Sequence, residues 1–180
     1  MTLADTKNLS NPISRLFPAA LIACLLTGHA GAAEKVAVFE FEIVRGSVFP
    51  GAPDHHEAEE QRLRMIGQRL RDHLAKSGKF QPVDTTAVAE KAAASNLQAC
   101  GNCADSLARD VGASYAFTGT VHKVSELILS INVYVHEAAT SKPVTGASVD
   151  LRGNTDESWR RGIDYLYKNV LSARLEKLLK

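Results

Sequence analysis

The stretch "LILSINVYVHE", residues 127–137, has an apolar side chain at every second position from Leu127 to Val135. A period of two is typical of a β-strand that buries one face and leaves the other wet or shared. The stretch therefore predicts a long strand whose apolar positions line the core. The expected inward set is Leu127, Leu129, Ile131, Val133 and Val135.

The segments on either side of this strand also have strand character. "SYAFTGTVHKV" (114–124) precedes it, and the turn "AATSKP" (138–143) leads into "VTGASVDLR" (144–152). In the last segment, alternate apolar residues from Ala147 to Leu151 continue the inward face. These three segments predict a three-stranded antiparallel meander.

The first half of the chain reads as alternating strands and helices. "KVAVFEFE" (35–42) predicts a buried central strand, and the Gly- and Pro-containing segment 43–60 predicts a long loop. Apolar residues at helical spacing predict a helix over about 59–77, stopped by Gly78. "FQPV" (80–83) predicts a short edge strand, because proline is tolerated only at an edge.

Three further helices are expected. "TTAVAEKAAASN" (85–96) is alanine-rich, and "ADSLARDVGA" (104–113) predicts a short helix ended by a glycine. Asn154 and Glu157 have the spacing of a helix N-cap, and an apolar stripe from Trp159 to Leu178 predicts a closing helix of roughly 20 residues. The predicted fold is an α/β layered domain: a mixed sheet with a C-terminal antiparallel meander, helices packed on the sheet and a long C-terminal helix.

Residues 1–32 have the features of a signal peptide. Lys7 and Arg15 precede the apolar run "LFPAALIACLLTG", and the small residues 30–32 predict cleavage before Ala33. The run of about 13 residues is too short to span a bilayer as a helix. Residues 33–180 are then expected to form a single domain in the periplasm. A lipoprotein acylated at Cys24 is the alternative, because residues 21–24 also fit a lipobox.

The expected mature chain carries no net charge. The leader holds two of the 21 basic and one of the 20 acidic side chains, which leaves 19 of each in the remainder. Nucleic-acid binding and polybasic membrane attachment both depend on a surplus of positive charge. The balance therefore favours proteins or small molecules as partners.

Cys100 and Cys103 are the two cysteines left after removal of the leader. In a periplasm, cysteines so close together are expected to form a structural disulfide. A redox-active pair and a metal or haem ligand pair remain alternatives. The residues before Cys100 predict a helix, whereas the redox pair of thioredoxin-type proteins follows a strand. Ala104 stands where the usual haem-attachment motif has histidine.

The segment "DHHE", residues 54–57, is a second candidate metal site. Imidazoles and carboxylates suit zinc, copper or nickel. A solvated loop that leads into a helix is the other interpretation of these residues. No cofactor is expected from the sequence, which contains none of the GxSxG, P-loop, GxGxxG or HExxH motifs.

The segment "DLRGNTDESWRR", residues 150–161, is the densest group of polar residues in the chain. It can be a capped strand-to-helix turn with an anchoring tryptophan. It can also present a partner-binding surface built on Arg152, Trp159 and Arg160, because aromatic residues and arginines dominate protein interfaces. Both interpretations remain open at this point.

Two resemblances follow from longer stretches. "VAVFEF" (36–41), a helix, "SGKFQPVD" (77–84) and "LARDVGASYAFTGTVHKV" (107–124) resemble the α/β domain shared by the curli-secretion lipoprotein, the amino-terminal domain of TolB and the lipoprotein activators of penicillin-binding proteins. Residues 121–144 and 148–169 are similar to an uncharacterised family of secreted proteobacterial proteins, a domain of unknown function.

These resemblances imply a periplasmic accessory or scaffold domain with no known reaction and no catalytic residue to transfer. The expected function is therefore non-enzymatic binding of another periplasmic or envelope protein. The alternative is a periplasmic thiol-disulfide or metal-handling protein that uses the Cys100 and Cys103 pair.

Overall fold

A computed structural model describes residues 32–46 and 56–179. The predicted signal peptide and Cys24 lie outside the described residues, apart from Ala32 at the end of the leader. The six-stranded sheet has the order β3-β1-β4-β5-β6, and β2 also pairs with β4. The strands are β1 Glu34–Val38, β2 Glu42–Arg45, β3 Phe80–Pro82, β4 Tyr115–Lys123, β5 Ile128–Glu137 and β6 Lys142–Arg152.

The sheet is mixed, as predicted. β1 pairs in parallel with β3 and β4, whereas β4, β5 and β6 form the antiparallel meander. The helical segments are α1 His56–Lys76, a 3₁₀ turn Thr86–Val88, α2 Ala89–Ala93, α3 Cys103–Asp110, α4 Asp156–Leu166, a π-helical turn Tyr167–Leu171 and α5 Ser172–Leu178. α4, the π turn and α5 run on without a break and form the predicted long C-terminal helix.

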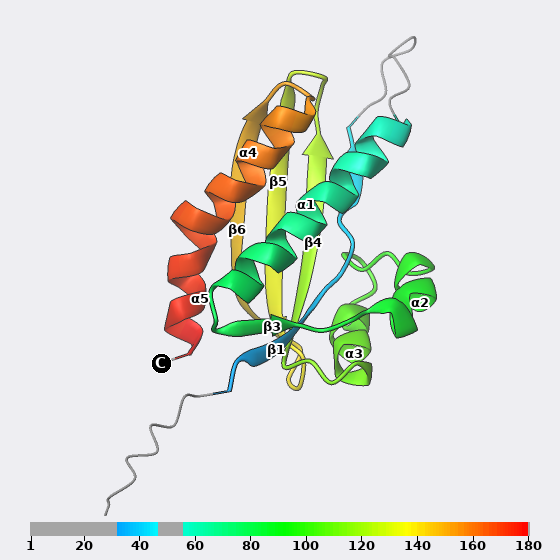
Figure 1. The fold of residues 1–180 in the computed structure, drawn as a ribbon. Coiled ribbons are helices and arrows are strands. Elements are labelled where there is room, and N and C mark those ends of the chain that lie inside the picture. The colour runs from blue at the N-terminus through cyan, green and yellow to red at the C-terminus, as the bar shows by residue number, and fades with distance from the viewer. Residues whose placement is uncertain (1–31, 47–55, 180) are drawn as a thin grey trace, which may run out of the picture. The chain divides into compact units, whose positions relative to one another are not determined.

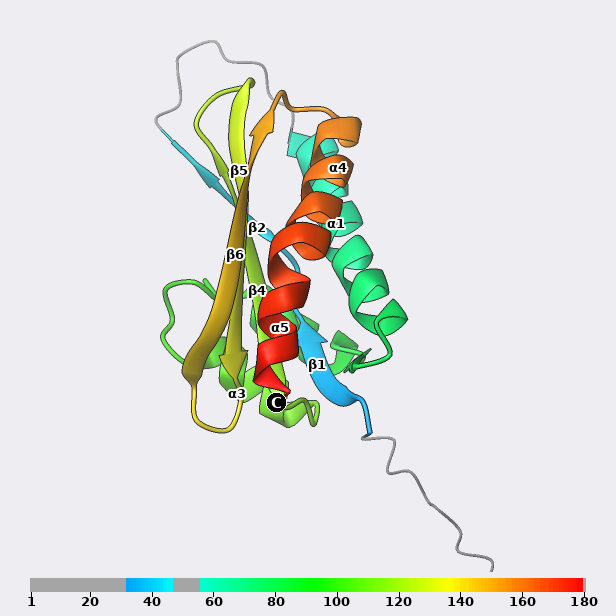
Figure 2. The ribbon, with the colours of Figure 1, turned by 90° about the vertical axis from the view of Figure 1, so that its left-hand side faces the viewer.

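The helices cover the two faces of the sheet unequally (Figures 1 and 2). α1, α4 and α5 lie on one face and bury the main core, to which Trp159 contributes a fully buried indole. α3 lies on the opposite face near one end of the sheet, where Phe39 and Leu107 belong to a second, smaller core. The rest of this face carries the polar side chains of the meander.

The first strand is interrupted, contrary to the expectation of one continuous strand over 35–42. Val38 of β1 pairs with Phe117, and Glu42 of β2 pairs with Thr120. The segment from β1 to β2 therefore has one residue more than β4 between these two pairs. An extra residue of this kind is a β-bulge, which changes the face toward which the following side chains point. Val38 and Phe41 therefore both reach the main core. The prediction that a loop begins at residue 43 is wrong, because residues 43–45 belong to β2. Residues 47–55 of the predicted loop lie outside the described part of the chain.

Two helices, α1 and the alanine-rich helix expected over 85–96, differ from their expected bounds. α1 begins at His56, three residues before the predicted start, and ends near Gly78, which has the predicted left-handed φ of 69°. The alanine-rich segment forms only a 3₁₀ turn and the five-residue α2, which buries none of its own side chains. Without a buried face, little packing is available to extend this helix.

Two glycines of the sheet and the C-terminal helix allow close packing. A Cβ atom on Gly119 would lie 2.2 Å from the ring of Phe41, and one on Gly162 would lie 2.2 Å from Leu151 Cδ2. Gly119 thus gives Phe41 room to pack on β4 after the bulge. Gly162 brings α4 close to β6.

Candidate interaction surface

The tip of the β4–β5 hairpin, residues 124–128, exposes three large apolar side chains. Val124 is 63% exposed, Leu127 71% and Ile128 46%. The sequence placed Leu127 in the inward set, and this is wrong because β5 begins one residue later, at Ile128. Exposed apolar residues gathered at one site commonly mark a surface that contacts another molecule.

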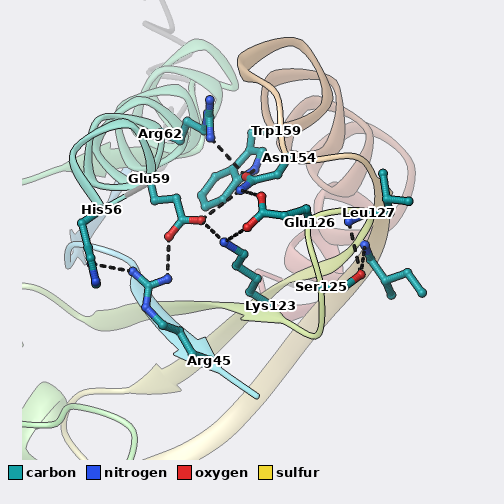
Figure 3. A network of polar contacts seen from close by, with 11 residues as sticks. Arg45, His56, Glu59, Arg62, Lys123, Ser125, Glu126, Leu127, Asn154 and Trp159 are labelled. Carbon is teal, nitrogen blue, oxygen red and sulfur yellow. Dashed lines mark hydrogen bonds and ion pairs between the residues drawn. The ribbon is translucent and has the colours of Figure 1, made fainter. Parts of the chain in front are cut away.

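The hairpin tip is a tightly bonded turn. The backbone N–H groups of Val124 and Ser125 donate to the carbonyl oxygen of Ile128 at 3.0 and 3.1 Å. The Ser125 hydroxyl accepts from the N–H groups of Leu127 and Ile128, both at 3.2 Å (Figure 3). These bonds fix the backbone that carries the exposed side chains, which reduces the entropy that the turn would lose on binding.

Beneath the tip lies a group of charged and polar side chains that we call the Glu59 network: Arg45, Glu59, Lys123, Glu126 and Asn154 (Figure 3). Glu59, from the first turn of α1, is only 1% exposed. Arg45 bonds one of its carboxylate oxygens, and Lys123 and Asn154 bond the other. The buried carboxylate of Glu59 is thus compensated by two basic groups, as a buried charge must be.

Asn154 connects this network to the hairpin tip and to the core. Its amide nitrogen donates to Glu59 Oε1 and to Glu126 Oε2, both at 2.9 Å. Its Oδ1 accepts from Trp159 Nε1 at 2.9 Å and from Arg62 at 3.2 Å. Since Glu126 belongs to the hairpin tip and also pairs with Lys123, the tip is tied to α1 and to the turn before α4.

The ionisation of Glu59 suits a structural role. Burial raises its pKa, but the hydrogen bonds from Lys123, Arg45 and Asn154 together lower it by a larger amount. The pKa therefore falls from its ordinary value of 4.5 to about 2. A carboxylate with such a pKa stays charged at neutral pH, where general acid or base catalysis would need a value near the working pH. Glu59 therefore acts as a charged partner that joins α1 to β2, β4 and the turn before α4.

The structure separates the three residues of the predicted partner surface. Arg152 is exposed and pairs with Ile128 in the β5–β6 register, which places it beside the hairpin tip. Arg160 is also exposed and bonds Glu157, one turn earlier on α4. Trp159 is fully buried, so its assignment to a surface is wrong: the indole packs in the core and gives its N–H to Asn154.

The predicted N-cap of the closing helix is also shifted. α4 begins at Asp156, and Thr155 and Ser158 form a reciprocal capping box in which each side chain bonds the other residue's backbone N–H. The side chain of Asn154, the expected cap, instead forms hydrogen bonds within the Glu59 network. The signal for Glu59 was present in the sequence, because it lies in line with Leu63, Ile66 and Leu70 on the helical stripe.

Cys100 and Cys103 lie where the short helix begins. Their sulfur atoms are 2.14 Å apart, Cys103 is the first residue of α3, and both side chains pack against the smaller core. Turns rather than a strand precede Cys100. Asn102 occupies the N-cap position, but its side chain makes no cap hydrogen bond.

The structure describes only two of the four residues of the candidate metal site, residues 54–57. Asp54 and His55 lie outside the described residues, whereas His56 and Glu57 form the start of α1. His56 Nδ1 lies 2.8 Å from an Arg45 guanidinium nitrogen. Among the described residues, no three His, Cys, Asp or Glu side chains are grouped closely enough to hold a metal ion.

The open face of the sheet bears two histidines. His122 and His136 lie on this polar face, and His136 Nδ1 is 3.3 Å from Oδ1 of Asp105, a buried residue of α3. This contact links α3 to β5.

No helix within 32–46 and 56–179 combines the length and apolar character that a bilayer span requires.

Comparison with known proteins gives a family but no activity. The family model DUF3280, described as "Protein of unknown function (DUF2380)", matches residues 34–171. This agrees with the similarity to a domain of unknown function that the sequence indicated. No curated protein matches the chain.

Three solved structures of bacterial proteins illustrate the similarity in fold. The LpoB C-terminal domain from Escherichia coli is 16% identical, with 67% of this chain and 83% of that chain covered and a TM-score of 0.47. Lipoprotein GNA1162 from Neisseria meningitidis is 12% identical over 81% and 93%, with a TM-score of 0.47. TolB from Acinetobacter baumannii, one of the proteins named in the sequence resemblance, is 14% identical over 79% and 28%, with a TM-score of 0.45.

Proposed function

The chain belongs to the DUF3280 family, whose description names no function, and we propose that its domain is a non-enzymatic periplasmic accessory module that binds another periplasmic or envelope protein. The hairpin tip is the observation that supports this proposal. Its exposed Val124, Leu127 and Ile128 are fixed from below by Glu126 and Asn154. Exposed apolar side chains that gather at one site commonly mark a surface that contacts another protein.

The charge pattern around the tip supports the same proposal. Arg152 lies next to Ile128, while the basic groups Arg45 and Lys123 are neutralised inside the Glu59 network. The surface thus offers an apolar centre with one exposed guanidinium beside it. A protein partner with an apolar recess and a neighbouring carboxylate would complement this surface.

Export is part of the proposal. A leader cut before Ala33 would deliver the domain to an oxidising compartment, where Cys100 and Cys103 form a structural disulfide rather than a catalytic one. Cell fractionation is expected to find the shortened chain in the periplasm. The proposal would be wrong if the uncleaved chain were found in the cytosol with both thiols free.

Photo-crosslinking in cells tests the binding surface. A photoreactive amino acid replaces Leu127 in one variant and Tyr165 in the control, because Tyr165 is also well exposed but lies on α4. We expect one defined protein adduct from position 127 and none from position 165. Adducts of equal yield at both positions, or none at either, would contradict the proposal.

A further inference from the structure

β6 has an open edge. It is the last strand in the sheet order, and no strand in the described part of the chain pairs with its outer side (Figure 2). It is also the longest strand, with 11 residues from Lys142 to Arg152. An edge strand presents unpaired backbone N–H and C=O groups, which can pair with another extended chain.

The hydrogen bonds identify which residues face outward. Gly153 N–H donates to Leu127 O at 3.0 Å, which makes these two residues a hydrogen-bonded pair. In an antiparallel ladder such pairs alternate with pairs whose backbone groups point away from each other. Odd-numbered residues of β6 therefore bond β5, and the even-numbered residues Ser148, Asp150 and Arg152 direct their N–H and C=O groups outward.

A side-chain contact agrees with this assignment and limits the open part of the edge. The carbonyl oxygen of Gly146, an even-numbered residue, accepts a hydrogen bond from the Arg174 guanidinium. The C-terminal helix thus covers the edge near Gly146. The open backbone groups are those of Ser148, Asp150 and Arg152, at the end of β6 that meets the hairpin tip.

We infer that this edge receives an extended segment of the partner protein as an added β-strand. The inference rests on the proposed function and specifies how that partner binds. Arg152 pairs with Ile128 across β5 and β6, so the edge and the hairpin tip form one continuous surface. In strand addition, backbone hydrogen bonds supply affinity and alternate side chains supply specificity.

The exposed side chains favour a different protein over a second copy of this chain. A two-fold antiparallel pairing that engages all three outward residues would place Asp150 opposite Asp150 of the other copy. Like charges directly opposite each other destabilise a strand pair. A segment with a basic residue opposite Asp150 and an acidic residue opposite Arg152 would complement the edge instead.

Ser148→Pro removes the outward N–H without removing a backbone bond to β5. It also removes the bond that the Ser148 hydroxyl donates to Asn132 Oδ1 on β5, and Ser148→Ala, which loses that bond but keeps the N–H, controls for this loss. Proline is tolerated on an edge strand when its nitrogen faces away from the sheet. Ser148→Thr is the matched control, since it keeps the N–H and a β-branched side chain suits a strand. Unfolding curves of these variants establish that the domain stays folded.

A library of random nonapeptides displayed on phage serves as the probe. Peptides selected on the purified full chain are expected to bind Ser148→Pro at least tenfold more weakly than wild type, and to bind Ser148→Thr as wild type does. In amide hydrogen exchange on wild type, the peptide should protect Ser148, Asp150 and Arg152 but change Val149 and Leu151 little. The inference is overturned if no peptide is enriched, or if the proline variant binds equally well.

Two further outcomes separate this inference from the proposed function. If the chain forms a dimer in sedimentation that Ser148→Pro dissolves, a second copy occupies the edge and the inference fails. If the crosslink at position 127 is found but Ser148→Pro leaves its yield unchanged, the partner binds only through the hairpin tip. The proposed function then stands while the strand addition does not.

Discussion

Asn154 and Trp159 are joined by a hydrogen bond of 2.9 Å from the indole Nε1 to the amide Oδ1. The same amide group donates to Glu59 and Glu126. One side chain thus satisfies the core tryptophan, the buried carboxylate of α1 and the hairpin tip. The position of the exposed tip depends on this amide.

Replacement of Asn154 by alanine should destabilise the domain. The change leaves the Trp159 N–H unpaired in the core and removes a donor from Glu59, and each buried group left unsatisfied costs about 1–3 kcal/mol. We expect a loss of about 2–4 kcal/mol in the free energy of unfolding, measured in urea. Asn169→Ala, which removes an exposed helical amide bonded to Tyr165 O, is the control and should change it by less than about 0.5 kcal/mol.

Glu59 should make the domain sensitive to acid. Its pKa is about 2 in the folded state against an ordinary value of 4.5, so the carboxylate stabilises the fold above pH 4.5. This stability is lost as the pH falls from about 5 toward 2, by about 3 kcal/mol in all. Urea unfolding of wild type across this pH range measures the loss.

Glu59→Gln tests the origin of that acid sensitivity. The amide keeps the shape but takes the Glu59 carboxylate away from Arg45 and from Lys123, which keeps only its pairing with Glu126, and this should cost about 3 kcal/mol at pH 7. The difference from wild type should shrink as the pH approaches 2. Asp164, whose pKa of about 2 is set mainly by the Arg69 hydrogen bond, titrates in both proteins and contributes to the slope that remains. An unchanged slope in Glu59→Gln would refute the assignment.

Gly119 should not tolerate a side chain. The Cβ atom of alanine would lie 2.2 Å from the Phe41 ring, so the ring or strand must shift. Overpacking of a core typically costs about 1–3 kcal/mol. Gly46→Ala is the control, because its nearest atom would lie at an ordinary 3.5 Å, and thermal unfolding should show a clear loss only for Gly119→Ala.

The cysteine pair should contribute modestly to stability and not to binding. A disulfide that closes so small a ring stabilises a fold by about 2 kcal/mol on the chain-entropy model. The double variant Cys100→Ser/Cys103→Ser should lose about that amount in urea unfolding and keep the crosslink at position 127. Loss of the crosslink in a variant that remains folded would instead favour the thiol-disulfide function.

The antiparallel meander and the C-terminal helix could be predicted because their periods are unbroken. Every second residue from Leu129 to Val135 is apolar, and each of these residues is buried as expected. The bulge after Val38 could not be located, because residues 36–39 are all apolar and give no sign of the face toward which each one points. Either face could then be buried without a change in pattern.

The contacts of the Glu59 network could not be predicted from the sequence for a different reason. Glu59 and Asn154 are 95 residues apart, and only the packing of α1 against the turn before α4 brings them together. The turn itself was recognised as a polar cluster around Trp159. The indole can be buried only if its N–H has a hydrogen-bond partner, and that partner is Asn154. The sequence pattern assigned Asn154 to the N-cap of the closing helix instead.

The central claim is that the hairpin tip binds a partner protein, and an affinity measurement tests it most directly. The protein identified by crosslinking is purified and titrated against wild type, Leu127→Ser/Ile128→Ser and the exposed control Tyr165→Ser. The account predicts that the double variant binds at least tenfold more weakly, with unfolding curves like those of wild type, and that the control binds normally. Equal affinity of all three proteins would contradict it.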